Sequence, residues 1–205
     1  MPSIYALTDR GASGMPHDVL VRELVAGGIR WIQLREKELD DAAFFAQAER
    51  AVMELPAEVC LLINDRPDLA LGIMADGVHL GQGDLPPAEA RALPGAGQLI
   101  IGYSTHSVDE AVLAASDGAV DYLAIGPIFL SSTKNVRSPL GLEVIRRLRD
   151  RTEKPIIAIG GIDRSNVRSV IEAGADGCAV VAALYRGGNI VGNVQALIDA
   201  AGVVR

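Results

Sequence analysis

The chain has 205 residues, of which 49% are hydrophobic and 22% are charged, proportions that are ordinary for a globular protein with one large core. No run approaches the roughly 18 to 20 apolar residues of a membrane span, and the N-terminus lacks the parts of a signal peptide, so we expect a cytoplasmic protein without a membrane partner. The net charge of -7 argues against broad nucleic-acid binding, so an anionic ligand would depend on a few local cations.

Apolar, β-rich runs alternate with helical stretches along the whole chain. Strands are predicted near residues 3–8, 31–35, 59–64, 77–80, 99–103, 122–126, 155–159 and 177–181. Helices are predicted near residues 18–26, 40–54, 67–73, 87–92, 108–115, 142–150, 164–173 and 191–200. This alternation predicts an α/β fold with parallel strands, and eight units predict one (β/α)8 TIM barrel, a single domain over residues 1–205. An open doubly wound sheet is the alternative, because periodicity does not show whether a sheet closes.

A weak internal repeat supports the regular alternation. Similar short segments precede four of the predicted strands, at residues 26–29, 75–78, 118–121 and 174–177. A glycine that follows a helix supplies the left-handed residue that ends it, so we expect the same helix-to-strand junction to be used repeatedly. No linker or low-complexity tract divides the chain.

Polar side chains gather where the second predicted strand ends, at Gln33, Arg35 and Lys37. Because side chains alternate along a strand, Gln33 and Arg35 share one face, with Ile32 and Leu34 on the other. Arg offers a planar fork and Lys a mobile point charge, a combination that suits a highly charged anion. A solvated strand end is the alternative, since charged residues are mostly exposed.

Further polar residues follow other strands, at the end of a barrel where chemistry is usually found. Asp65 and Asp84 follow the third and fourth strands, and two carboxylates with phosphate oxygens and water are what Mg2+ prefers. Helix capping is the alternative for each Asp, because each stands shortly before a proline that can begin a helix. The Gly160-Gly161 pair after the seventh strand allows close backbone approach and indicates a phosphate site near the seventh and eighth strands.

The histidines and cysteines differ in what they predict. His17 precedes a helix and is interpreted as a surface residue, whereas His79 lies within a strand and is interpreted as a hydrogen-bonded residue inside the barrel. His106 follows the fifth strand, where an imidazole could reach a ligand, and its role stays open. Cys60 and Cys178 lie in apolar runs and are expected to be buried, reduced thiols. Trp31 is interpreted as a packing residue.

Together these motifs resemble the thiamine phosphate synthase family, and their order and spacing match over nearly the whole chain. They are QLREK at 33–37, INDR at 63–66, DGVHLGQ at 76–82 with Asp84, STH at 104–106, GPIF at 126–129 with Thr133 and Lys134, and AIGGI at 158–162. The resemblance implies a TIM barrel transferase that joins hydroxymethylpyrimidine diphosphate to a thiazole phosphate, giving thiamine phosphate and pyrophosphate. It implies these two small-molecule substrates and Mg2+ as the cofactor, and leaves open a homo-oligomer.

The resemblance also implies roles for individual residues. Asp65 and Asp84 would bind Mg2+, Ser104 would contact the pyrimidine, and two further groups would bind the phosphates. The diphosphate would be bound by Gln33, Arg35, Lys37, Asn64 and Lys134, of which Arg35, Lys37 and Lys134 would act in catalysis; the thiazole phosphate would be bound by Ser131, Thr133, Gly161, Val181 and Ala182.

Two positions depart from the family pattern. Leu130 and Ser131 replace a usual Pro-Thr, and Ala182 stands where Ser is frequent, which removes one hydrogen bond to phosphate. The loop from Leu130 to Ser138 has few apolar anchors, so we expect it to be mobile without ligand and to close over ligand. Two other functions stay open: a thiazole tautomerase, which would use a base such as His106 without Mg2+, and a non-catalytic phosphate-binding barrel.

Overall fold

The structure is a computed structural model that describes residues 2–130 and 138–202. Eight parallel strands pair in chain order, and β8 pairs with β1, so the sheet is a closed barrel. The strands are β1 Ile4–Leu7, β2 Trp31–Leu34, β3 Cys60–Asn64, β4 Gly77–Leu80, β5 Ile100–Thr105, β6 Tyr122–Ile125, β7 Ile156–Ile159 and β8 Gly177–Val180. The predicted (β/α)8 barrel is confirmed, and the open doubly wound sheet is wrong.

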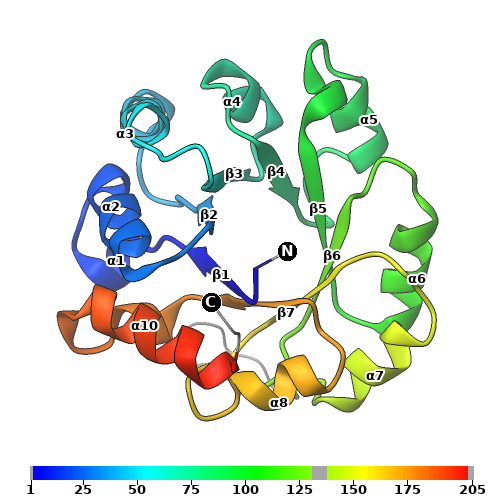
Figure 1. The fold of residues 1–205 in the computed structure, drawn as a ribbon. Helices are drawn as coiled ribbons and strands as arrows, with labels where there is room; N and C mark the ends of the chain where they lie inside the picture. Colours follow the sequence, from blue (N-terminus) through cyan, green and yellow to red (C-terminus); the bar gives the residue numbers. More distant parts are fainter. Residues whose placement is uncertain (1, 131–137, 203–205) are drawn as a thin grey trace.

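Helices form a ring outside the strands, as Figure 1 shows. The longer ones agree with the predicted ranges to within a few residues: α2 His17–Gly27, α3 Asp41–Met53, α4 Pro67–Gly72, α5 Pro87–Ala92, α6 Val108–Ser116, α7 Glu143–Arg149, α8 Val167–Glu172 and α10 Ile190–Ala201. Four short segments were not predicted, because three or four residues show no periodicity: α1 Arg10–Ser13, α9 Ala182–Tyr185, and the 3-10 turns η1 Ala96–Gln98 and η2 Arg186–Gly188. Within the described ranges, no helix is long and apolar enough to cross a membrane.

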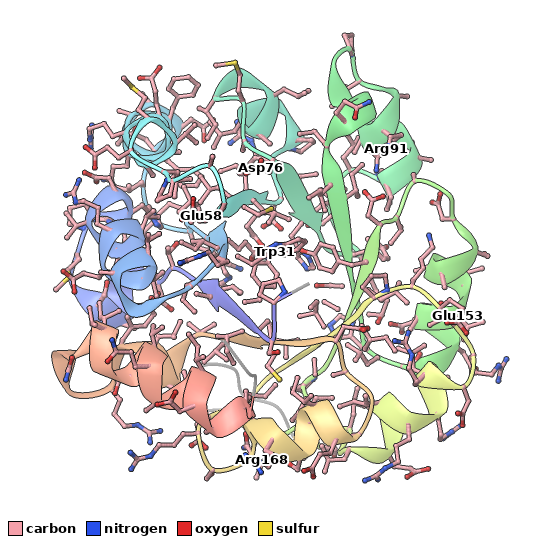
Figure 2. The ribbon with its side chains drawn as sticks, viewed as in Figure 1. Trp31, Glu58, Asp76, Arg91, Glu153 and Arg168 are labelled. Carbon is pink, nitrogen blue, oxygen red and sulfur yellow. The ribbon has the colours of Figure 1, made fainter. Side chains whose placement is uncertain are left out.

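The core has two parts, and they follow from the alternation of side chains along each strand. Outward-facing residues such as Ile32 and Leu34 pack against the helices in one large cluster. Inward-facing residues, including Tyr5 and Tyr122, form a smaller cluster inside the barrel. Trp31 packs edge-on against both tyrosines, with ring centroids 5.7 and 5.8 Å away, so its interpretation as a packing residue is confirmed. Figure 2 shows Trp31 within the ring of strands.

The repeat before the strands has a defined role at the amino-terminal end of the barrel. Asp76, Asp121 and Asp176 each stand just before a strand, and the Oδ2 atom of each accepts a backbone N–H of a neighbouring strand at 2.7 Å. Arg91 donates to Asp121 at 2.6 Å, and Arg149 donates to Asp176 at 2.9 Å. Arg91 lies with α5, outside the strands (Figure 2). These carboxylates fix strand register at the end of the barrel that serves stability.

The glycine caps of this repeat are only partly as predicted. Gly28 and Gly174 both take a φ of 107° after a helix, which confirms two left-handed junctions. Just before the second copy of the repeat, Met74 takes a left-handed φ of 57°, although it carries a side chain. Gly118 is not among the residues of positive φ, so the junction before β6 is built differently.

Candidate active site

A cavity of about 370 Å³ opens at the carboxyl ends of the strands. It is the place that the sequence predicted for chemistry in a barrel of this kind. Five predicted site residues line it: Arg35, Ser104, Gly161, Val181 and Ala182. Ser104 belongs to β5 itself, because that strand continues to Thr105, two residues beyond its predicted end.

A pair of carboxylates, Asp65 and Asp84, follows β3 and β4, and neither is among the residues that line this cavity. Burial and, after it, the neighbouring carboxylate of Asp84 raise the pKa of Asp65 to about 6, while Lys37 and Arg35 act in the opposite direction. Three predicted residues that follow β2 and β4 are therefore close enough to affect Asp65, which follows β3. The Asp65 N–H donates to the His79 carbonyl at 2.8 Å, and Asp84 Oδ2 accepts from the Gly81 N–H at 2.7 Å.

Neither carboxylate caps a helix, so helix capping, the alternative interpretation of Asp65 and Asp84, is wrong. The N-cap residue of α4 is Arg66 and that of α5 is Pro86, and neither helix has a side-chain cap. Asp65 has a φ of 65°, in the left-handed backbone region that residues other than glycine rarely adopt. Such strain costs on the order of 1 to 3 kcal/mol and is common at functional sites.

The two carboxylates fit a hard divalent cation. Burial and the repulsion between the two like charges raise the pKa of Asp65. A bound cation would offset that repulsion. Among the described residues, no cluster of three or more His, Cys, Asp or Glu could hold a metal. Two carboxylates are a donor set that suits Mg2+, whose remaining positions are usually filled by water and substrate phosphate.

A chain of hydrogen bonds crosses the inside of the barrel from Gln33 to Ser104. Gln33 Nε2 donates to the Tyr5 hydroxyl at 2.9 Å, and that hydroxyl lies 3.0 Å from the Tyr122 hydroxyl. The Tyr122 hydroxyl lies 2.8 Å from His79 Nδ1, and His79 Nε2 lies 2.8 Å from Ser104 Oγ. The prediction for His79 is confirmed, and burial lowers its pKa to about 4, so the ring is neutral. Sequence reasoning missed both tyrosines, because nothing separates them from other core aromatics.

Two other predicted residues stand on the same strand ends. Asn64 is the last residue of β3 and pairs in register with His79 of β4, next to the carboxylates. Lys37 is exposed, and its effect on the pKa of Asp65 places its charge near that carboxyl group. Ser131, Thr133 and Lys134 lie outside the described residues, as does all of the predicted closing loop except its two ends.

The cavity has three charged lining residues that sequence reasoning did not select. They are Asp9 and Asp163, which follow β1 and β7, and Arg186, which follows the short helix α9 after β8. Asp163 Oδ1 accepts from the Ser165 N–H and hydroxyl, which forms a local turn and delays the start of α8 to Val167. Position after a strand was the signal that could have found Asp9 and Asp163, whereas the unpredicted helix α9 separates Arg186 from β8.

The glycine pair and His106 also line the cavity. A Cβ atom on Gly161 would lie 2.3 Å from the Leu130 carbonyl oxygen, and one on Gly160 would lie 2.6 Å from Pro127 Cβ. The glycines allow close approach of the segment after β6, and the phosphate site predicted at this pair stays a prediction. His106 is mostly exposed, and its Nδ1 lies 3.7 Å from Glu110 Oε2 on α6.

Two predictions about histidine and cysteine need correction. His17 was predicted at the surface, but it is fully buried: Nδ1 lies 2.8 Å from Thr8 Oγ1, and Nε2 lies 3.0 Å from Glu36 Oε2. The first residue of α2 turns inward because these polar partners satisfy the ring. Cys60 and Cys178 are both free, as predicted, but only Cys178 is buried, since Cys60 begins β3 and is partly exposed.

Comparisons with known proteins agree with this geometry. A thiamine-phosphate synthase of Chloroflexus aurantiacus is 41% identical over 197 residues, which cover 95% of this chain and 90% of that protein. One of Gloeobacter violaceus is 50% identical over 173 residues, which cover 82% of this chain but half of that longer protein. The structure of thiamine phosphate pyrophosphorylase from Pyrococcus furiosus has a TM-score of 0.88 and 32% identity, covering 98% of this chain and 95% of that one.

These names favour the transferase over the thiazole tautomerase and the non-catalytic barrel. The activity is that of a thiamine-phosphate synthase, which acts on two small-molecule substrates. The family described as thiamine monophosphate synthase matches residues 4–184. The chain therefore belongs to the thiamine monophosphate synthase family.

Proposed function

We propose that this site divides the synthase reaction between a diphosphate end and a thiazole end. Asp65 and Asp84 hold Mg2+ at the diphosphate end, and the cations Arg35 and Lys37, which follow β2, belong to the same end. The observation that supports this division is that Asp84, Arg35 and Lys37 all shift the pKa of Asp65, while Arg35 also lines the cavity. The diphosphate group is bound by Gln33, Arg35, Lys37, Asn64 and Lys134.

The chemistry needs charge stabilisation more than it needs a base. The C–O bond between the pyrimidine methylene carbon and the diphosphate breaks, and the thiazole nitrogen forms a C–N bond to that carbon. Pyrophosphate takes the electron pair of the broken bond. Arg35, Lys37 and Lys134 stabilise the charge that gathers on the leaving oxygens. Mg2+, when bound, neutralises part of the same charge. A protein nucleophile is not required.

The pyrimidine lies between the two ends, in contact with Ser104. The hydrogen-bond chain through His79 and Tyr122 fixes the Ser104 hydroxyl, because each member is buried and has a partner on both sides. Gln33, which binds the diphosphate, stands at the other end of the same chain, so one network holds a diphosphate contact and the pyrimidine contact. This arrangement orients the substrate carbon toward the thiazole.

The thiazole phosphate occupies the cavity end near β7 and β8. Gly161 and the backbone at Val181 and Ala182 line that end, and Arg186 brings a positive charge to it. Main-chain N–H groups bind phosphate without a hydroxyl, so Ala182 weakens this contact without abolishing it. Ser131 and Thr133 contribute from the loop after β6.

The remaining features follow from composition and fold. A single barrel domain is supported by the uninterrupted alternation of strands and helices, and the absence of a nucleic-acid partner by the net charge of -7. A cytoplasmic location without a membrane partner completes the proposal. A homo-oligomer is compatible with this arrangement.

The direct test is incubation with both substrates and Mg2+, with thiamine phosphate detected by mass. Product should form with Mg2+ and should be lost after treatment with EDTA, then return when Mg2+ is added back. Asp84→Asn should give no return with Mg2+, because one of the two carboxylate ligands is missing. Product formation in EDTA equal to that with Mg2+ would contradict the metal assignment.

A further inference from the structure

Glu36 stands between Arg35 and Lys37 in sequence, yet its side chain points away from the solvent. The side chain is only 6% exposed, and each of its oxygens accepts two hydrogen bonds. Oε1 accepts from the backbone N–H groups of Lys37 and Glu38, both at 2.7 Å. Oε2 accepts from His17 Nε2 at 3.0 Å and from Arg10 Nη1 at 3.2 Å. A carboxylate can only accept, so His17 Nε2 carries the hydrogen of that bond.

His17 is neutral, because burial lowers its pKa despite the nearby carboxylate. With its hydrogen on Nε2, the Nδ1 atom accepts from the Thr8 hydroxyl at 2.8 Å, which is much nearer than the other acceptor of that hydroxyl, the Gln33 carbonyl at 3.4 Å. Thr8 Oγ1 in turn accepts the backbone N–H of Arg35 at 3.1 Å. One buried imidazole is therefore connected through Thr8 to the backbone of Arg35 and through Glu36 to the backbone of Lys37.

Regular secondary structure does not hold this segment. β2 ends at Leu34 and α3 begins at Asp41, so the backbone N–H groups of Arg35, Lys37 and Glu38 lie outside any strand ladder or helix. The donors of this segment are satisfied by Thr8 and Glu36 instead. Side chains thus supply the order that a ladder would otherwise give.

His17 is itself fixed by a third element. Its backbone N–H donates to Gln47 Oε1 of α3 at 2.9 Å, and its ring lies 5.3 Å from the ring of Phe44, also of α3. The imidazole is thus held between the segments that follow β1 and β2 and the helix α3. Figure 1 shows α2 and α3 outside the strands, on the side of β1 and β2. A binding site is held precisely when the residues that support it are fixed by packing and hydrogen bonds, as His17 is.

We propose that His17 is a positioning residue, which through Thr8 and Glu36 fixes the backbone that presents Arg35 and Lys37 to the diphosphate. This inference rests on the proposed function of those two cations. Cations held in place before the reaction stabilise the leaving group without a cost of reorganisation. Loosening their backbone should therefore weaken binding of diphosphate and leave the thiazole end unchanged.

The experiment compares three variants of the full chain. His17→Phe keeps a ring in the core but loses both hydrogen bonds, and His17→Gln restores a donor near the Nε2 position. Phe44→Leu is the matched control, because it disturbs packing around the same ring without removing either hydrogen bond. We would measure the affinity for pyrophosphate with Mg2+ by calorimetry, the KM of each substrate, and stability in urea.

His17→Phe should lower the pyrophosphate affinity about 10-fold and raise the KM of the pyrimidine diphosphate, with the KM of thiazole phosphate unchanged. His17→Gln should recover part of the loss, and Phe44→Leu should lose stability alone. If His17→Phe does not fold, Thr8→Val, which keeps the shape of Thr8, should show the same split between the two KM values.

Three outcomes would overturn the proposal. They are unchanged pyrophosphate affinity in His17→Phe or Thr8→Val, an equal rise in both KM values, or an equal affinity loss in Phe44→Leu, which would indicate a merely structural role. Arg35→Ala separates this inference from the proposed function. If Arg35→Ala leaves pyrophosphate affinity unchanged, the diphosphate site itself is wrong; if it weakens binding and His17→Phe does not, only the positioning role fails.

Discussion

Asp65 shares a partly buried site with Asp84, and burial together with that second carboxylate raises the pKa of Asp65 to about 6. An acid with a raised pKa stabilises the fold below its ordinary value, near 4, and this contribution is lost as the pH rises through about 6. At neutral pH, without a cation, the pair therefore lowers the free energy of unfolding. A site that is costly when empty is typical of a binding site.

Asp65→Asn should raise stability and abolish turnover. The amide removes the repulsion, and Asn tolerates the φ of 65° at this position well. After allowance for solvent screening, we expect a gain of about 1 kcal/mol at pH 8 and none at pH 4. Urea unfolding at the two pH values measures the difference. A loss of stability at pH 8 would show that Asp65 is a structural residue.

Tyr122→Phe should damage the substrate site from inside the barrel. The substitution leaves His79 Nδ1 and the Tyr5 hydroxyl without a shared partner, and unsatisfied buried groups cost about 1 to 3 kcal/mol. We expect lower stability and a higher KM for the pyrimidine diphosphate. Ile101→Val, at a buried core position of β5 outside the network, is the control and should lose stability with both KM values unchanged.

Ala182→Ser should improve the thiazole end of the cavity. One added hydrogen bond to phosphate is worth about 0.5 to 1.5 kcal/mol, which would lower the KM of thiazole phosphate by about 2- to 12-fold. Arg186→Ala should raise the same KM, because Arg186 brings a positive charge to the cavity lining. Steady-state kinetics with each substrate varied in turn measures both effects. A change confined to kcat would mean that the phosphate binds elsewhere.

Asp176→Ala should affect stability alone, because Asp176 lies at the opposite end of the barrel from the cavity. The substitution removes an acceptor from the Ile156 N–H and a partner from Arg149, and should cost about 1 to 3 kcal/mol. Urea unfolding and both KM values would be compared with wild type. A specific rise in the KM of one substrate would contradict a purely structural role for this end.

Much of the fold could be predicted, because strand and helix periodicity repeats eight times without interruption. Parallel strands bring their carboxyl ends together, so polar residues after each strand were expected to meet, and Asp65 does meet Asp84. The sequence did not separate a metal-binding pair from two helix caps, since either residue could also have capped the following helix. Only the backbone geometry at Arg66 and Pro86 excludes capping.

The supporting network was not predictable in the same way. His17 reads as a surface residue, because its partners Thr8 and Glu36 are distant along the chain and become neighbours only when β1 and β2 pair. Tyr5 and Tyr122, which are 117 residues apart, likewise have no shared signal in the sequence. Contacts between distant segments depend on the closed barrel, which periodicity alone does not establish.

The central claim is that Arg35 and Lys37 stabilise a departing pyrophosphate, and one paired assay tests it most directly. Arg35→Ala and His106→Ala would be compared with wild type for thiamine phosphate formation under saturating substrates and Mg2+. Arg35→Ala should lower kcat about 100-fold or more, because a preorganised charge-assisted contact is lost. His106→Ala should change kcat far less, since the mostly exposed imidazole lies beside Glu110. A large loss in His106→Ala with normal turnover in Arg35→Ala would contradict the account.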